Sequence, residues 1–452
     1  MKLFGTSGIR GLINDKLTPE LAVKAGLTFS TFLGNEGMVA VGMDARLGNF
    51  MLKYSLTAGL LAGGMNVLDL GYSSTPAVLH VVKKLKLKGA VAVTGSHTPP
   101  EIHGLLFFKK DTSELFQSEE EVFEKIFFEE SFKREKWDGI GKYSESSSEK
   151  IYVENLLSRF NREFKGYRVV VDAGHSPSSN ALCKILESVG CKVYMLNTDL
   201  DGRFPSRPPN PLPEYLDMLK KKVIDVDADF GIALDGDGDR ATFVDERGNV
   251  VLPDYMGALF SKYELIDKKG GVIVCPINTS NVIYYVLENY GGRYVHTRIG
   301  PPAMAEALVK TENAIYAFEE TGKYIWPENV YYGDPGFAAL RLLEILSRDG
   351  SLSSIIDEFP KYYIKKLAIP CPDEKKKAVL EKIQKMLYKK EDVELVLVDG
   401  VKVVFPNRDW ILLRPSGTEP VFRCFVESSS EKKLEELVKK ALKIVEEAMK
   451  GC

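Results

Sequence analysis

The chain has 452 residues, of which 44% are hydrophobic and 27% charged, and its formal net charge is −3 at pH 7. This length and composition are typical of a globular protein with several domains. The balanced charge gives no electrostatic footprint for nucleic acid, and no apolar run is long enough to cross a membrane. Six scattered cysteines without a Cys-x-x-Cys pair, and an N-terminus without the apolar core of a signal peptide, predict a cytoplasmic protein with reduced thiols.

Strand and helix signals alternate through the first three quarters of the chain. We expect residues 1–148, 149–249 and 250–364 to form three α/β domains, with helices packed on mixed, mostly parallel sheets. Their similar size and element order predict a structural repeat. The stretch 144–148 is expected to be flexible. In residues 365–452 strand follows strand before a final amphipathic helix, which predicts a separate α+β domain.

The stretch that organises the chain is Asp235-Gly-Asp-Gly-Asp-Arg240. Apolar runs on both sides predict a tight loop between two strands. Three converging carboxylates repel each other unless a hard cation joins them, so Asp235, Asp237 and Asp239 are candidate ligands for Mg²⁺ or Ca²⁺. The alternative is a solvated acidic turn. An EF-hand is excluded because Arg240 stands where that motif needs glycine, and because the flanks indicate strands.

A second candidate stretch is Thr94-Gly-Ser-His-Thr-Pro-Pro100, which follows a predicted buried strand at 89–94. A serine at the carboxyl end of a parallel strand lies where open α/β sheets bind ligands. Ser96 beside His97 suggests a nucleophile with a base, although neighbours in sequence rarely point at each other. An ordinary turn is the alternative interpretation.

Three further stretches carry polar groups suited to a sugar phosphate. Arg414-Pro-Ser-Gly-Thr-Glu419 offers N–H and O–H donors for a phosphate. The turn Glu319-Glu-Thr-Gly-Lys323 could hydrogen-bond to sugar hydroxyls, and Phe4–Gly11 holds Arg10 in a glycine-rich loop. Taken singly, they also fit a polar turn between strands, a surface turn and a frayed terminus.

In combination and order, these stretches resemble the α-D-phosphohexomutase family over the whole chain. The resemblance implies three similar α/β domains and a C-terminal α+β domain around a central cleft. It implies an isomerase that interconverts hexose 1-phosphates and 6-phosphates through a phosphoserine and a bisphosphorylated sugar. Mannose and glucose phosphates are the first choice, with glucosamine phosphate close behind. The implied cofactors are Mg²⁺ and an activating hexose 1,6-bisphosphate. The implied partners are small-molecule sugar phosphates, without nucleic acid or membrane, in a monomer or homodimer.

The resemblance also implies a role for each candidate residue. Ser96 would carry the phosphate, and the catalytic groups beside it would be His97, Arg10 and Arg240. The Mg²⁺ ligands would be Ser96, Asp235, Asp237 and Asp239. Glu319 and Thr321 would bind the sugar. The phosphate of the substrate would be bound by Arg414, Ser416, Gly417 and Thr418.

The sequence departs from the family pattern at several positions. Leu106 replaces a lysine that is a candidate general base, and Pro302 replaces a second lysine. The other departures are Thr98 for asparagine, Phe318 for glycine, and Lys323 where His, Asn or Gly is commoner. His97 or His103 could perform the proton transfer instead, since histidine has a suitable intrinsic pKa. The missing lysines also allow a second hypothesis, a sugar-phosphate-binding homologue with impaired catalysis, although the intact aspartates and Ser96 argue against it.

Overall fold

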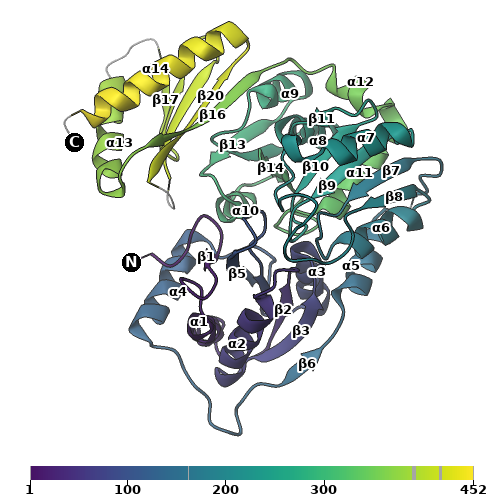
Figure 1. Cartoon of the computed structure of the whole chain (residues 1–452), viewed down its shortest axis with the longest axis vertical. Helices are drawn as coiled ribbons and strands as arrows, with labels where there is room; N and C mark the ends of the chain where they lie inside the picture. The colour runs from purple at the N-terminus through teal and green to yellow at the C-terminus, as the bar shows by residue number, and fades with distance from the viewer. Residues whose placement is uncertain (1, 161, 389–392, 417–419, 451–452) are drawn as a thin grey trace.

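The computed structural model describes residues 2–160, 162–388, 393–416 and 420–450, and Figure 1 shows the whole chain. The domains follow each other along an arc, with the purple first domain and the yellow fourth domain at its two ends. Among the described residues, no helix is both long and apolar enough to cross a membrane.

The first domain contains a six-stranded sheet in the order β1-β5-β4-β2-β3-β6. Its first helix begins at Pro19, where the Thr18 hydroxyl accepts a hydrogen bond from the Leu21 N–H and so caps the first turn. The strands are β1 (Ile9–Leu12), β2 (Met38–Met43), β3 (Asn66–Tyr72), β4 (Gly89–Val93), β5 (Ile102–Lys109) and β6 (Tyr143–Glu145). The helices are α1 (Pro19–Phe32), α2 (Asn49–Ala62), α3 (Thr75–Leu85) and α4 (Gln117–Glu129).

The second and third domains contain sheets in the orders β11-β10-β9-β7-β8 and β13-β12-β14-β15. The second domain consists of α5 (Ser148–Leu157), β7 (Arg168–Asp172), α6 (Ser179–Ser188), β8 (Lys192–Leu196), η1 (Pro213–Tyr215), α7 (Asp217–Asp225), β9 (Phe230–Leu234), β10 (Ala241–Asp245) and β11 (Val250–Val251). The third consists of α8 (Pro253–Asp267), β12 (Val272–Pro276), α9 (Val282–Tyr290), β13 (Arg293–Thr297), α10 (Pro301–Lys310), β14 (Ala314–Glu319), β15 (Lys323–Ile325), α11 (Pro335–Asp349) and α12 (Leu352–Ile356).

These three α/β domains share one topology, which confirms the predicted repeat. In each, three strands pair in parallel, with the first in the chain lying between the third and the second. The next strand then turns back and pairs antiparallel with the third: β5 with β4, β10 with β9 and β15 with β14. The three candidate loops of the sequence therefore occupy equivalent positions, at the turn after the third parallel strand.

The fourth domain has an antiparallel sheet in the order β16-β20-β19-β18-β17, covered by two helices, as predicted. Buried residues of the last helix recur every three to four positions (Leu434, Val438, Ala441, Val445 and Ala448), so one apolar stripe faces the sheet. The elements are β16 (Tyr363–Pro370), α13 (Asp373–Tyr388), β17 (Glu394–Val396), β18 (Val401–Val404), β19 (Trp410–Pro415), β20 (Val421–Ser428) and α14 (Glu431–Met449).

Three details differ from the sequence-based expectations. The stretch 144–148 is not a flexible linker: Ser144 lies in β6, which pairs with β3, and Ser148 begins α5. Phe4–Gly11 is not frayed, because Phe4 is buried and β1 pairs with β5. The strand β16 also crosses the predicted boundary at 364/365, since it pairs with β20 along its whole length.

Several hydrophobic clusters cross domain boundaries: first-domain residues pack with Val330 and Tyr332 of the third domain, and Ile277 of the third domain packs with Trp410 and Leu412 of the fourth. A single cluster of buried residues runs from Tyr152 in α5 through both the second and third sheets to Phe359. The first and fourth domains have clusters of their own. Because apolar burial is the main favourable term in folding, the second and third domains form one packed unit to which the other two attach.

Candidate functional site

The aspartate loop connects β9 to β10 and is buried. Asp235, Asp237 and Asp239 are each at most 1% exposed, and one carboxylate oxygen from each lies within 4.8 Å of the others. Among the described residues, Asp237 Oδ1 and Asp239 Oδ1 accept no hydrogen bond, and Asp239 Oδ2 lies 2.8 Å from the Lys323 Nζ. Burial and the neighbouring carboxylate of Asp239 raise the pKa of Asp235 to about 6, and burial raises the pKa of Asp237 well above its usual range. Buried oxygens without donors are what a hard divalent cation needs, so the residues fit Mg²⁺.

Ser96 lies directly against this loop. Its hydroxyl donates a hydrogen bond of 2.8 Å to Asp235 Oδ2, and the residue is fully buried. Its φ of +52° is in the left-handed region, which a non-glycine residue adopts only where its surroundings enforce it. Gly236 allows the close approach, because a Cβ there would lie 2.6 Å from the Ser96 carbonyl oxygen. The serine loop and the aspartate loop therefore form one site.

Positively charged groups surround the serine. The Arg240 Nε lies 3.9 Å from Asp235 Oδ2 and 3.8 Å from Asp239 Oδ1, and Arg10 donates to the Gly95 carbonyl at 3.5 Å. Burial and then the charges of Arg240 and Arg10 hold the pKa of His97 well below its usual range. The imidazole is therefore neutral at pH 7, and its Nδ1 lies 3.4 Å from the Ser96 hydroxyl oxygen. The two arginines suit an anionic group on Ser96, and the neutral imidazole of His97 can accept a proton beside it.

Sequence reasoning missed two buried arginines that shape these loops. Arg46 donates to the carbonyl oxygens of Ser96 (2.7 Å), Thr98 (2.7 Å) and Pro99 (2.5 Å), while its Nε pairs with Asp44 at 3.1 Å. These bonds fix the path of the serine loop. The only signal in the sequence is an Asp-x-Arg triplet directly after a strand, which is common in loops.

Arg207 has the same function for the aspartate loop. Its Nη2 donates to the Leu234 carbonyl at 2.7 Å, at the end of β9, and its Nε donates to Asp172 Oδ2 at 2.7 Å. Thr75, at the start of α3, adds a contact from the first domain, donating to Asp237 Oδ2 at 2.5 Å. The first and second domains therefore hold the site jointly.

The predicted sugar loop lies next to the aspartate loop. Glu319 is 3% exposed at the end of β14, and the Thr321 hydroxyl donates to its Oε1 at 2.5 Å. The Ala241 N–H donates to the Gly322 carbonyl at 2.9 Å, which joins this turn to the start of β10. Burial lowers the pKa of Arg240, but the carboxylate of Glu319 raises it more than any other group, and the net shift is upward. Glu319 thus faces the same cation as the aspartates.

The predicted phosphate loop belongs to the fourth domain. Arg414 lies at the end of β19 and Ser416 is buried beyond it, whereas Gly417 and Thr418 lie outside the described residues. The Arg414 Nε lies 2.8 Å from Asp399 Oδ2, which also accepts a hydrogen bond from the Ile299 N–H at 3.0 Å. A cavity of about 190 Å³ is lined by residues from the first, third and fourth domains, among them Thr6, Arg298, Pro302 and Arg414. Arg414 therefore faces a space that three domains enclose.

Comparison with known proteins identifies the family. Models of the phosphoglucomutase/phosphomannomutase family match the chain in order: α/β/α domain I over residues 1–134, domain II over 150–248, domain III over 252–363 and the C-terminal domain over 367–444. The chain belongs to the phosphoglucomutase/phosphomannomutase family. The resemblance drawn from the sequence motifs is thereby confirmed, and with it the assignment as an intramolecular phosphotransferase.

Similar members of the family have different names. The chain is 37% identical to a phosphoglucomutase/phosphomannomutase of Thermococcus kodakarensis, over 100% of both chains. It is 38% identical to a probable phosphoglucosamine mutase of Pyrococcus furiosus, over 99% of this chain and 98% of the other. A crystal structure of a family protein from Burkholderia thailandensis matches it with a TM-score of 0.89 at 26% identity, covering 100% of this chain and 98% of the other.

The departures from the family pattern have structural counterparts. Leu106 is fully buried in an apolar cluster that includes Tyr332, and Pro302 is buried in the first turn of α10. His103 is also buried; its Nδ1 bonds to Asn49 Oδ1 at 2.7 Å, and burial lowers its pKa to about 4. Of the two candidate histidines, only His97 contacts Ser96 among the described residues.

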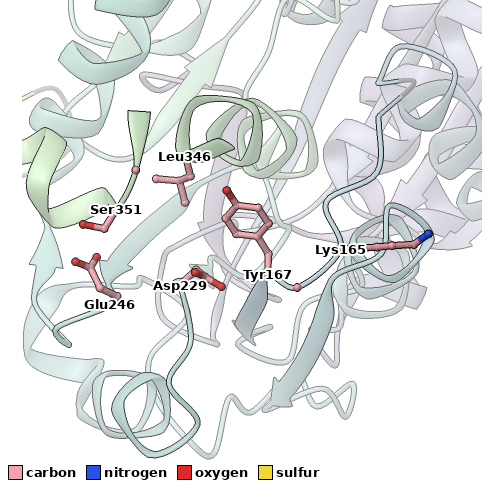
Figure 2. Close-up of a pocket in the computed structure, with 8 residues that line it drawn as sticks. Lys165, Tyr167, Asp229, Glu246, Leu346 and Ser351 are labelled. Carbon is pink, nitrogen blue, oxygen red and sulfur yellow. The ribbon is translucent and has the colours of Figure 1, made fainter. Parts of the chain in front are cut away.

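A cavity of about 300 Å³ lies elsewhere, between the second domain and the end of α11. Figure 2 shows Tyr167, Leu346 and Glu246 around it, with Lys165 extending away from them. It contains none of the predicted site residues, so it does not belong to the phosphohexomutase site.

Proposed function

We propose that this member of the family interconverts hexose 1-phosphates and hexose 6-phosphates, with Ser96 carrying the transferred phosphate. The observation that supports this most directly is the Ser96 hydroxyl, which lies 2.8 Å from Asp235 among buried carboxylate oxygens without donors. A serine hydroxyl in a merely structural role would not need such a costly cluster of charges beside it.

The reaction has two balanced halves. In the first, the P–O bond to Ser96 breaks, the phosphoryl group bonds to the free hydroxyl oxygen of the sugar phosphate, and the hydroxyl proton passes through His97 to the Ser96 oxygen. A hexose 1,6-bisphosphate results, and it turns over in the cleft. In the second half its other phosphoryl group returns to Ser96, and the proton of the Ser96 hydroxyl passes through His97 to the sugar oxygen. Arg10 and Arg240 stabilise the phosphoryl charge in both halves.

The remaining residues bind and orient. We assign Glu319 and Thr321 to the sugar hydroxyls, and we assign the second phosphate to Arg414, Ser416, Gly417 and Thr418. When bound at Asp235, Asp237, Asp239 and the Ser96 oxygen, Mg²⁺ supplies charge neutralisation for the phosphoryl group. Free hexose 1,6-bisphosphate would serve as activator by loading Ser96. Cys183, Cys191, Cys275 and Cys424 are buried and form no disulfide among the described residues, which supports a cytoplasmic location.

Mannose and glucose phosphates remain our first choice of substrate, with glucosamine phosphate close behind. The Glu319 turn is the region that would discriminate among them, because Phe318 and Lys323 differ there from the common family residues. A third relative, from Thermococcus kodakarensis, is named phosphopentomutase and is 35% identical over 100% of this chain and 99% of its own length, so a pentose 1-phosphate belongs in the same assay.

The test begins with mass spectrometry of the purified protein and of its Ser96 peptide. We expect one phosphate on Ser96, removed by adding the preferred sugar phosphate and restored by glucose 1,6-bisphosphate with Mg²⁺. Turnover of the four sugar 1-phosphates is then measured side by side. If no sugar is turned over and Ser96 cannot be loaded, the proposal is wrong.

The missing lysines at positions 106 and 302 favour one alternative, a homologue that binds sugar phosphates without turning them over. It predicts that sugar phosphates raise the melting temperature while Ser96 stays unmodified. Phosphorylated Ser96 that is lost on adding substrate would exclude this alternative.

A further inference from the structure

A lysine from the third domain lies beside the aspartate cluster. Lys323 begins β15, is 1% exposed, and places its Nζ 2.8 Å from Asp239 Oδ2. Its Nζ also lies 3.9 Å from the centre of the Tyr332 ring, within range of a cation–π interaction. A buried ammonium is costly unless it is paired, and here its partner is a candidate metal ligand.

The surrounding charges explain why a lysine is tolerated there. Asp239 is one of three buried aspartates, Glu114 is also buried, and the Arg240 Nε lies 3.8 Å from Asp239 Oδ1. Burial raises the pKa of Glu114 to about 7, and Lys323 is the strongest of the charges that oppose this rise. Lys323 therefore pairs with Asp239 of the second domain, and its charge also acts on Glu114 of the first.

The position of Lys323 is fixed by the fold rather than by a flexible loop. Lys323 pairs with Glu319 across the β14–β15 ladder, and the turn between them is bonded to Ala241 through the Gly322 carbonyl. The apolar cluster that contains Leu106 also contains Tyr332, on whose ring the ammonium rests. Leu106 of the first domain thus stands where the family has a lysine. The Lys323 ammonium of the third domain contacts Tyr332, which belongs to the same apolar cluster as Leu106.

We propose that Lys323 is a built-in counter-ion of the aspartate cluster: its ammonium holds Asp239 in the metal-free protein and weakens the binding of Mg²⁺. This inference rests on the proposed function, because it takes the aspartates as the metal site. Lys323 is a positioning residue that acts through Asp239. Its positive charge would repel a divalent cation bound by the aspartates, and its ammonium would compete with that cation for the Asp239 carboxylate.

The test measures the Mg²⁺ dissociation constant by isothermal titration calorimetry on three proteins: wild type, Lys323→Met and Lys323→Arg. Removing the charge should tighten Mg²⁺ binding about tenfold or more, whereas the arginine variant should stay within about threefold of wild type. Damage to the fold would loosen metal binding, so tightening is a readout that a structural role would not give. Equal or weaker binding by Lys323→Met overturns the inference.

The outcomes separate this inference from the proposed function. If none of the three proteins binds Mg²⁺, the metal site itself is wrong. If all three bind it equally, the metal site stands and the counter-ion is wrong. Asp237→Asn serves as the control without metal binding.

A second measurement covers the case in which Lys323→Met does not fold. In EDTA, Asp239→Asn leaves the ammonium buried without its partner and should lower the melting temperature. The double variant Asp239→Asn/Lys323→Met removes both charges and should melt at a higher temperature than Asp239→Asn alone. A double variant that melts at the same or a lower temperature contradicts the pairing.

Discussion

The serine–aspartate site and the phosphate loop of the fourth domain both use arginine, but in different surroundings. Arg46 and Arg207 are buried, and they donate to backbone carbonyls of the loops that they shape. The Arg414 side chain is 20% exposed, and its Nε faces the Asp399 carboxylate beside a cavity. An arginine bonded to carbonyls fixes a loop, whereas an arginine paired with a partly exposed carboxylate can exchange that partner for a phosphate.

This difference suits the proposed reaction. The transferred phosphate always meets the same serine, so its site gains from a fixed geometry. The substrate phosphate must be bound in two orientations, so its site gains from a partner that can be displaced. The packing of the domains fits this difference. The second and third domains share one hydrophobic core, whereas the fourth domain, which carries Arg414, has a core of its own.

The largest expected effect is on the fixed site. Ser96→Ala removes the atom that accepts the phosphate, and we expect activity to fall by at least about a thousandfold. The melting temperature should fall by a few degrees at most, because the variant loses only the hydrogen bond to Asp235 and the longer contact with His97. A coupled assay and circular dichroism check both points. The exposed Ser131→Ala is the control with wild-type activity; a Ser96→Ala enzyme that kept a substantial fraction of activity would refute the role of Ser96.

The second effect concerns the stability of the same region. Arg207→Met leaves Asp172 buried without its cation and the Leu234 carbonyl without this donor. We expect a loss of about 3–5 kcal/mol in the free energy of unfolding, measured by urea denaturation. Arg203 in the same loop is the matched control, since it pairs with Asp201 on the surface. Arg203→Met should unfold like wild type, and a similar loss in both variants would show that the loop, and not the buried pair, matters.

The third effect is a pH dependence of stability, which we expect from the buried carboxyl group of Asp254. Asp254, in the first turn of α8 near the fourth domain, has its pKa raised to about 8 by burial and then by Glu320 and Glu427. A carboxyl whose pKa is higher in the folded state binds its proton more tightly there, so its stabilising contribution is complete below about pH 4 and is lost as pH rises to about 8.

Asp254→Asn should therefore gain stability relative to wild type as pH rises across this window. We expect a gain on the order of 3 kcal/mol at pH 8 and almost none at pH 4. Urea denaturation of both proteins at several pH values measures it, with the exposed Asp225→Asn as control. A constant difference at all pH values would mean that Asp254 does not titrate in this range.

The positions of the candidate loops could be predicted because each follows an apolar run and is punctuated by glycine or proline. Sequence reasoning placed β4, β9 and β14 before the loops of Ser96, Asp235 and Glu319, and alternation indicated the repeat. The pairing of β6 was missed because 144–148 has almost no apolar side chains; its hydrogen bonds come from the edge of β3. Local propensity carries no information about such a partner.

The long-range polar contacts could not be predicted. Arg46 and Arg207 matter through carbonyl groups that lie 27 or more positions away in sequence. Lys323 was noticed as an unusual residue, but its pairing with Asp239 depends on how the third domain packs on the second. Sequence patterns fix which face of an element is buried, and not which buried donors and acceptors meet across domains.

The smallest effect on activity is expected for Arg414, whose carboxylate partner Asp399 can be displaced by the substrate phosphate. Arg414→Met should lower kcat/KM by about tenfold to a hundredfold, mainly by raising KM, because a charge-assisted contact to the substrate phosphate is lost. The melting temperature should hardly change, since the Arg414–Asp399 pair is partly exposed and such pairs contribute little. The control is Arg408→Met: Arg408 pairs with Glu288 at the surface and does not line the cavity. Loss of kcat at unchanged KM would move Arg414 from substrate binding to the chemical step. The contrast between a fixed and an exchangeable arginine site would then fail.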